Sequence, residues 1–454
     1  MAEAKTADPA PAPHPGVAGS LPAASRKSLE DKQARAHLFA DPEYFQWGGS
    51  VIRDEQGTYH MFYARWRRDN PRGMYGWQRV SEIARATADR PEGPYHHQEV
   101  VLKGFGKPQP DRWDAVDAHN PCITMMMDPV SKKQRYYLYF VATRDDNNMK
   151  DDWWDHAINQ RVGVAVADSL EGPWKRHPEP VITPPTGALH HFLVNPGVCQ
   201  LPDGRFLMVL KGRAPGAGRH KVGPQAQGWA LADRPEGPFI GQDSLLIPPS
   251  IPAEDPCVWI QDSWIFAAFK DWHGKISGKP GISFIRGKLQ TDDTISWNIP
   301  KKALISGRMI TWDDGRVSKL KHLERPFILL DDEGRPSHLF AAASTHGPYV
   351  NGAKTPRDPG APLVPLQNLP FNLCLPLSGE NNTKGEDLSS FIRLAKRDQT
   401  ESLDVALTTY TKGKVSVTLH GALHIAEKSY YDELNRRFGE HDSLLFEGVG
   451  DAEG

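Results

Sequence analysis

Acidic side chains recur at one place in this sequence, just before a proline that opens an apolar stretch. Glu254 and Asp255 precede Pro256, and Glu324 lies two residues before Pro326. Carboxyl groups held close together can act as general acid and general base, because their surroundings push their pKa values apart. These residues are far apart in the sequence, so the elements that follow the prolines must bring them together.

The prolines belong to a pattern that occurs five times. Each copy has a short polar group, an apolar stretch, a turn, and a second apolar stretch that ends in charged or aromatic residues. Short apolar runs bounded by Gly, Pro and Asp predict β-hairpins. The five copies open at Trp47-Gly48-Gly49, His119-Asn120-Pro121, Val194-Asn195-Pro196, Glu254-Asp255-Pro256 and Glu324-Arg325-Pro326.

A third apolar stretch ends in the same turn in three of the copies. The turn reads Glu-Gly-Pro-aromatic at residues 92–95, 171–174 and 236–239, and another apolar stretch follows. Four strands in each copy, at a spacing of roughly 60 to 75 residues, are typical of a β-propeller blade. The sequence therefore predicts an all-β protein, a five-bladed β-propeller over residues 37–385, with a short C-terminal α/β fragment. A β-sandwich is the alternative, and the matching turns disfavour it.

The innermost strand of each propeller blade reaches the central channel at one end. We therefore expect the five openings to converge there and to form a binding site. The candidate catalytic residues are Glu254, Asp255 and Glu324, with Asp117 and His322 close to two of the openings. The candidate substrate-binding residues are Trp47, Arg65, His119, Arg144, Lys211 and Lys270.

Carboxylates that meet at one axis match the needs of glycoside hydrolysis. One group protonates the leaving oxygen and another activates water, at a separation of about 6.5–9.5 Å in an inverting enzyme. The structural alternatives are specific: Asp255 could be a turn residue before Pro256, and Glu254 could form a scaffolding ion pair with Lys270. A non-catalytic carbohydrate-binding propeller and a glycoside phosphorylase are the competing functions.

The blade openings and the repeated Glu-Gly-Pro turn resemble the five-bladed propeller glycosidases of glycoside hydrolase families 43 and 117, over residues 40–380. The resemblance implies an inverting hydrolase of a plant or algal poly- or oligosaccharide. It places Asp255 and Glu324 at acidic positions of the family 117 pattern. It places His322 at the position of the histidine that is proposed as the acid in that family. Family 43 has Asp-Pro at the first opening, where this chain has Gly48-Gly49. Asp117 is therefore the preferred base, and Asp114 the second choice.

Composition limits the partners. With 54 Lys and Arg against 56 Asp and Glu, the chain has no general basic character, so we expect no nucleic-acid partner. No apolar run reaches the roughly 18 residues that span a bilayer, so we expect no membrane partner. No spacing of a dedicated metal motif is present. A structural calcium ion in the central channel would resemble some propeller hydrolases.

The two ends of the chain differ from the repeats. Residues 1–36 are expected to form a flexible lead without the apolar core of a signal peptide, whereas the family resemblance implies a periplasmic or secreted protein. Residues 386–454 predict two or more strands, a helix over 428–438 and a strand over 443–448. Gly421, His424 and Glu447-Gly448 resemble the beginning of a TraB/Tiki-like domain, which would be incomplete here.

Overall fold

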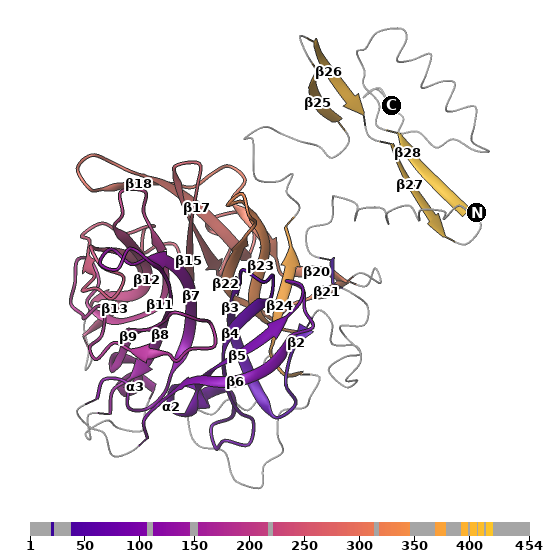
Figure 1. Ribbon diagram of the computed structural model, residues 1–454. Helices are drawn as coiled ribbons and strands as arrows, with labels where there is room; N and C mark the ends of the chain where they lie inside the picture. The colour runs from indigo at the N-terminus through magenta and orange to yellow at the C-terminus, as the bar shows by residue number, and fades with distance from the viewer. Residues whose placement is uncertain are drawn as a thin grey trace, which may run out of the picture. The chain divides into compact units, whose positions relative to one another are not determined.

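The computed structural model describes residues 20–21, 38–106, 112–145, 153–216, 221–312, 317–345, 368–377, 392–397, 400–405, 407–412 and 415–420. The chain divides into two compact units, residues 1–383 and 384–454. The first unit contains five antiparallel sheets arranged around an axis (Figure 1). The predicted five-bladed β-propeller is therefore confirmed.

Each blade is a sheet built on four strands, and the strand that carries the opening lies innermost. Blade four has a fifth strand, β19 (Leu304–Gly307), which pairs with the third strand of that blade. Blade one has β3 (Tyr44–Arg53), β4 (Tyr59–Arg67), β5 (Glu82–Ala88) and β6 (His96–Lys103). Blade two has β7 (His119–Met127), β8 (Gln134–Thr143), β9 (Gln160–Ala167) and β10 (Lys175–Arg176). Blade three has β11 (His191–Gln200), β12 (Phe206–Pro215), β13 (Val222–Ala232) and β14 (Ile240–Gly241). Blade four has β15 (Ala253–Gln261), β16 (Trp264–Asp271), β17 (Gly281–Leu289) and β18 (Ile295–Asn298).

Blade five closes the ring with a strand from the other end of the propeller sequence. It consists of β22 (His322–Leu330), β23 (Pro336–Ser344), β24 (Phe371–Pro376) and the short β2 (Leu38–Phe39). Leu38 pairs with Leu373 in antiparallel register. The blade can therefore form only when residues more than 300 positions apart meet.

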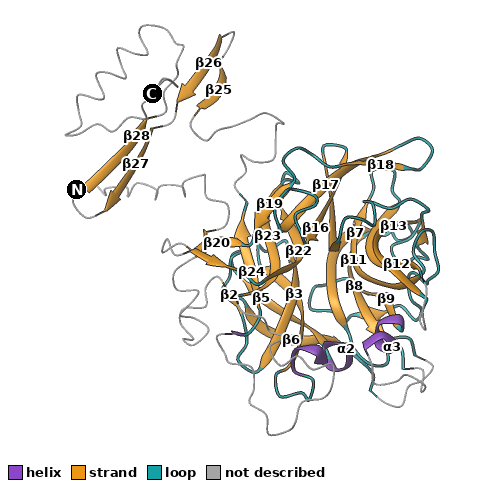
Figure 2. Cartoon of the chain, turned by 180° about the vertical axis from the view of Figure 1, so that it is seen from behind, coloured by secondary structure: helices purple, strands orange, loops and turns teal. Residues whose placement is uncertain are grey.

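The remaining elements are short. They are η1 (Gly73–Gly76), α2 (Trp77–Val80), α3 (Trp153–Ile158), β20 (Met309–Trp312) and β21 (Val317–Lys319). Strand β1 (Ser20–Leu21) lies within the expected lead and pairs in parallel with β20. Helices are rare beside the strands (Figure 2). None of the helices in the described part of the chain is long and apolar enough to cross a bilayer.

The second unit contains two antiparallel hairpins among its described residues. They are β25 (Ile392–Arg397) with β26 (Thr400–Val405), and β27 (Leu407–Lys412) with β28 (Val415–His420). The helix expected over residues 428–438 and the strand over 443–448 lie outside the described residues. The same holds for the residues that carry the TraB/Tiki resemblance.

Hydrophobic side chains hold neighbouring blades together. Successive side chains of a strand point to opposite faces of its sheet, so one strand serves two interfaces. Phe140 on β8 packs in the core shared with blade one, and its neighbour Tyr139 packs in the core shared with blade three. Three further buried clusters join blades three and four, four and five, and five and one. The core is therefore a closed ring of five interfaces.

Candidate active site

The five openings do not precede the inner strands but lie inside them. In each inner strand the register shifts at the opening, as between Glu254 and Cys257 of β15. One residue per blade there has a left-handed backbone, where a side chain is normally disfavoured. These residues are Gly48, Asn120, Asn195, Asp255 and Arg325, with φ between 51° and 60°. The bulge turns each of them toward the axis.

Hydrogen bonds connect four of these bulge residues, those of blades two to five, into the floor of the channel mouth. Asn120 Nδ2 donates to Asn195 Oδ1 at 2.5 Å, and Asn195 Nδ2 donates to Asp255 Oδ1 at 2.5 Å. The backbone N–H of Arg325 donates to Asp255 Oδ2 at 3.1 Å. The Arg325 side chain passes across Gly48, where a Cβ atom would lie 3.1 Å from Arg325 Cβ. The floor thus links blades two to five by hydrogen bonds, and the Arg325 side chain covers Gly48 of blade one.

A cavity of about 510 Å³ opens above this floor, within the usual range for small-molecule sites. A void of about 10 Å³ lies on its other side, lined by the prolines that follow the bulges. The cavity therefore has a closed end. It is lined by Trp47, Trp66, Met74, Tyr75, Trp77, His119, Asn120, Trp153, Gln160, Phe192, Val194, Asn195, Lys211, Arg213, Gln225, Glu254, Asp255, Lys270, Trp272, His322, Glu324 and Arg325.

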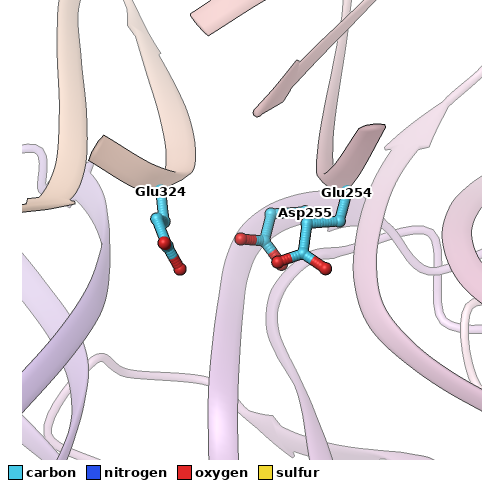
Figure 3. Close-up of side chains that lie close together, drawn as sticks. All are labelled: Glu254, Asp255 and Glu324. Carbon is cyan, nitrogen blue, oxygen red and sulfur yellow. The ribbon is translucent and has the colours of Figure 1, made fainter. Parts of the chain in front are cut away.

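Three carboxylates meet at one side of the cavity. Glu254 and Asp255 are adjacent on β15, and Glu324 faces them from the neighbouring strand β22 (Figure 3). One oxygen from each lies within 4.8 Å of the others. Asp255 and Glu324 are buried. Repulsion among three such groups requires nearby cations or shared protons.

Lysine and histidine side chains supply the opposing charge. Lys270 Nζ lies 2.6 Å from Glu324 Oε1 and 3.3 Å from Glu254 Oε1. Lys211 Nζ lies 3.2 Å from Glu254 Oε2, and His322 Nδ1 lies 2.8 Å from Glu324 Oε1. The Lys270 ammonium also lies 3.3 Å from the centre of the Trp272 ring. Lys270 therefore joins the carboxylates of two blades.

These contacts give the three carboxylates different affinities for protons. Burial raises the pKa of Glu254, but Lys211 and Lys270 outweigh it and bring the value to about 2. Burial and the negative charge of Glu254 raise the pKa of Asp255. Burial alone would raise the pKa of Glu324, but His322 and Lys270 outweigh this effect and lower that pKa. Asp255 is thus the best proton acceptor of the three, since Glu254 and Glu324 hold their charge more firmly.

Aromatic rings form another part of the cavity wall. His119 stacks on Trp77 with ring centres 4.7 Å apart, and Trp66 meets it edge-on at 5.6 Å. Its Nδ1 lies 2.8 Å from the Ser81 hydroxyl. Burial, with Arg325 nearby, holds the pKa of His119 well below its usual range. His119 is therefore a neutral hydrogen-bonding group among rings that suit the faces of sugars.

Most of the candidate residues lie in the cavity wall. Glu254, Asp255, Glu324, His322, Trp47, His119, Lys211 and Lys270 all line it. Asp114, the second choice for the base, does not line it, and its carboxylate pairs with Arg112 and Arg176. Three other candidates do not line it either. Asp117 is fully buried, and its Oδ1 accepts the backbone N–H of Thr143 at 2.7 Å. Arg65 pairs with Glu82 at 2.8 Å, and Arg144 is exposed.

Other lining residues were not among the candidates. Arg213 lies two positions after Lys211 on β12, so strand alternation places both on one side, a signal that the sequence contains. Asn120, Asn195 and Arg325 were grouped at the openings, but their spacing does not reveal the left-handed bulge. Trp153, the first residue of α3, and Phe192, which has a positive φ within β11, also line the cavity, and no periodic pattern in the sequence indicates them.

A calcium ion does not fit the donor set of this site. Calcium takes six to eight oxygen ligands, whereas both oxygens of Glu254 and Oε1 of Glu324 already accept from lysine or histidine. Both oxygens of Asp255 accept from Asn195 and Arg325. The ammonium of Lys270 occupies the space between the two glutamates that a cation would need.

No protein-family model matches the sequence, so the TraB/Tiki resemblance gains no support, and no curated protein matches it. Solved structures do show similarity. A family 117 glycoside hydrolase from the marine bacterium Zobellia galactanivorans is 17% identical, with 74% of this chain and 85% of that chain covered and a TM-score of 0.47.

Two further similar structures carry related descriptions. An α-L-arabinofuranosidase from Lactobacillus brevis is 12% identical, with 74% and 92% of the two chains covered and a TM-score of 0.45. A GH43_1 enzyme from Xanthomonas citri is 12% identical, with 84% and 96% covered and a TM-score of 0.43. The five-bladed architecture of this chain follows from its own strand order.

Proposed function

We propose that the protein is a glycoside hydrolase that cleaves an oligo- or polysaccharide in the channel-mouth cavity. The observation that carries the proposal is the meeting of Glu254, Asp255 and Glu324 beside His322 in a closed-ended, aromatic-lined cavity. Glycosidic bond cleavage needs a proton donor, a proton acceptor and a surface for sugar rings. Each of these is available within one wall of the cavity.

The spacing of the carboxylates favours an acid from outside their cluster. Their nearest oxygens lie within 4.8 Å, less than the roughly 6.5–9.5 Å that leaves room for the attacking water of an inverting enzyme. Two members of the cluster therefore do not suit both roles of an inverting reaction. His322 is the imidazole beside these carboxylates, and its Nδ1 contact with Glu324 orients the ring.

The proposed reaction assigns one role to each group. Asp255 accepts a proton from water as the water oxygen attacks the anomeric carbon, and the glycosidic bond breaks. His322 gives a proton to the leaving oxygen, and Glu324 holds the imidazole ring in position through its contact with Nδ1. Glu254 keeps its charge beside Lys211 and Lys270 and raises the basicity of Asp255.

Asp117 is less suited to be the base than Asp255. Burial raises its pKa to about 7, which would suit a base at neutral pH. However, Asp117 does not line the cavity, and a general base must lie within hydrogen-bonding reach of the water that it activates. Its contact with the Thr143 backbone instead anchors the segment before β7 to β8.

The test is hydrolysis of a panel of aryl glycosides, oligosaccharides and polysaccharides by the purified protein. We expect release of reducing sugar, with the first-formed anomer inverted when followed by NMR. Running each reaction with and without phosphate separates hydrolysis from phosphorolysis, which the lysines and arginines of the cavity would otherwise permit. Binding of a saccharide without turnover would instead support a carbohydrate-binding propeller.

A further inference from the structure

The cations that line the cavity are of two kinds. Lys211 and Lys270 form ion pairs with Glu254, and Lys270 also pairs with Glu324. Arg213 and Arg325 form no ion pair with any described residue, although both line the same cavity. The two lysines face three carboxylates. The charges of Arg213 and Arg325 act on Glu254 and Asp255 across the cavity, but neither guanidinium group is in a direct ion pair with them.

Arg325 lies in the floor of the cavity. The residue is 8% exposed, and its Nε has no hydrogen-bond partner among the described residues. The chain of Arg325 fills the space above Gly48, where a Cβ atom would lie 3.2 Å from Nε. A charged side chain that is buried without a partner is costly. The guanidinium is therefore preorganised for a group that enters the cavity.

The charge of Arg325 opposes the rise in the pKa of Asp255, but the Asp255 carboxylate makes no hydrogen bond with this guanidinium. Its two carboxylate oxygens accept from the Asn195 side chain and from the backbone N–H of Arg325. No hydrogen bond or ion pair connects the Asp255 carboxylate with the Arg325 side chain. The two groups are neighbours in the floor, and the planar N–H fork of Arg325 keeps its binding capacity.

Arg213 offers a second guanidinium against aromatic rings. It lies 5.4 Å from the centre of Phe192 and 5.8 Å from that of Trp154. Its Nη1 makes one long hydrogen bond, 3.4 Å to the Gly223 carbonyl, and its Nε has no partner among the described residues. A sugar ring that contacts Phe192 would present its substituents to this group.

We propose that the cavity selects a saccharide that carries an anionic group, a uronic-acid carboxylate or a sulfate ester, which pairs with the guanidinium of Arg325 and is supported by Arg213. The inference rests on the proposed function and names its substrate class. Guanidinium binds planar carboxylates and sulfate-like oxyanions through paired N–H donors. A neutral sugar would leave the Arg325 guanidinium without a directly bonded anionic partner.

The experiment compares binding of matched glycosides to the full-length protein. Calorimetry or NMR titration uses the methyl glycosides of glucuronic acid and glucose, and of galacturonic acid, galactose 6-sulfate and galactose. Charged hydrogen bonds contribute enough that we expect the best anionic member to bind roughly tenfold to hundredfold more tightly than its neutral partner. The carboxylate and sulfate members show which anion the site takes.

Arg325→Asn is the informative variant. Asparagine occupies the equivalent left-handed position in blades two and three, at Asn120 and Asn195, so the backbone tolerates it. We expect this variant to lose the preference for the anionic glycoside, Arg325→Lys to retain part of it, and Arg213→Gln to reduce it. Unchanged thermal unfolding of Arg325→Asn would show that the loss concerns binding.

Several outcomes would overturn the inference. These are equal affinity for neutral and anionic members, a preference that survives in Arg325→Asn, or inorganic phosphate or sulfate binding as tightly as the anionic glycosides. Turnover of neutral glycosides alone would also overturn it while leaving the proposed hydrolase intact. Preferential binding of an anionic glycoside without any turnover would support the inference and contradict the hydrolase.

Discussion

The ammonium of Lys270 lies 2.6 Å from the carboxylate of Glu324, and both side chains are at least 90% buried. The two residues belong to neighbouring blades, on β16 and β22. Lys270 also contacts Glu254 at 3.3 Å, so one lysine holds two like charges together. The arrangement of the candidate site thus depends on a cation from the second strand of blade four.

Removing this lysine should destabilise the propeller. In Lys270→Met, Glu324 and Glu254 lose their shared counter-charge while remaining buried. We expect the free energy of unfolding, measured with denaturant, to fall by about 3–5 kcal/mol. Lys175→Met, at an exposed lysine of β10, is the control and should change it by less than about 0.5 kcal/mol. Similar losses in both variants would show that Lys270 is not a buried counter-charge.

The stability contributed by Glu254 should depend on pH. Its pKa in the folded protein, about 2, lies below its ordinary value of 4.5. The stabilisation is therefore present above about pH 4.5 and is lost as pH falls toward 2. Glu254→Gln should be less stable than the unmodified protein by on the order of 3 kcal/mol at pH 7, and the gap should narrow by pH 3. A gap that stays constant over this range would contradict the ion pairs with Lys211 and Lys270.

Gly48 should tolerate alanine less well than another glycine of the same backbone conformation. Gly48 and Gly73 have φ of 55° and 53°, so alanine costs about 1–2 kcal/mol of backbone strain at both. A Cβ atom at Gly48 would also meet Arg325, whereas one at Gly73 meets nothing within 4 Å. We expect a larger loss of unfolding free energy for Gly48→Ala than for Gly73→Ala. Equal losses would mean that Arg325 does not lie against Gly48.

Chelation should leave the activity unchanged. The carboxylate oxygens that would bind a divalent cation already accept from Lys211, Lys270, His322, Asn195 and the Arg325 backbone. We expect the turnover rate and the unfolding temperature after EDTA treatment and dialysis to match those of untreated protein. A loss that added calcium restores would show that a cation displaces Lys270 from the glutamates.

The sequence contained much of the propeller because the blade pattern is local. Prolines after the bulge, Glu-Gly-Pro turns and short apolar strands mark each blade within its own stretch. Closure of blade five was not predictable, because β2 has two residues and its partner β24 lies more than 300 positions away in the sequence. The five bulges were not predictable for a related reason. The sequence pattern assigns residues such as Asp255 to loops before the strands, whereas they lie inside the strands.

The candidate site was predictable where it depends on the repeat and not where it depends on packing. Glu254 and Glu324 occupy the same position of two blades, so the alignment on the proline places both at the cavity. Asp117 lies two residues before His119 but turns inward to bond the Thr143 backbone. Arg65 lies at the end of β4, where Glu82 on the adjacent strand pairs with it. Such partners are set by strand register.

The most direct test of the proposed catalysis is the turnover rate of Asp255→Asn on the best substrate found for the unmodified protein. Asparagine fits the left-handed backbone there, as it does at Asn195. The proposal predicts a fall in kcat of at least roughly a hundredfold, with KM changed by only a few-fold. If Asp255→Asn kept the turnover rate of the unmodified protein, that result would contradict both the role of Asp255 as the base and the proposal that hydrolysis takes place in this cavity.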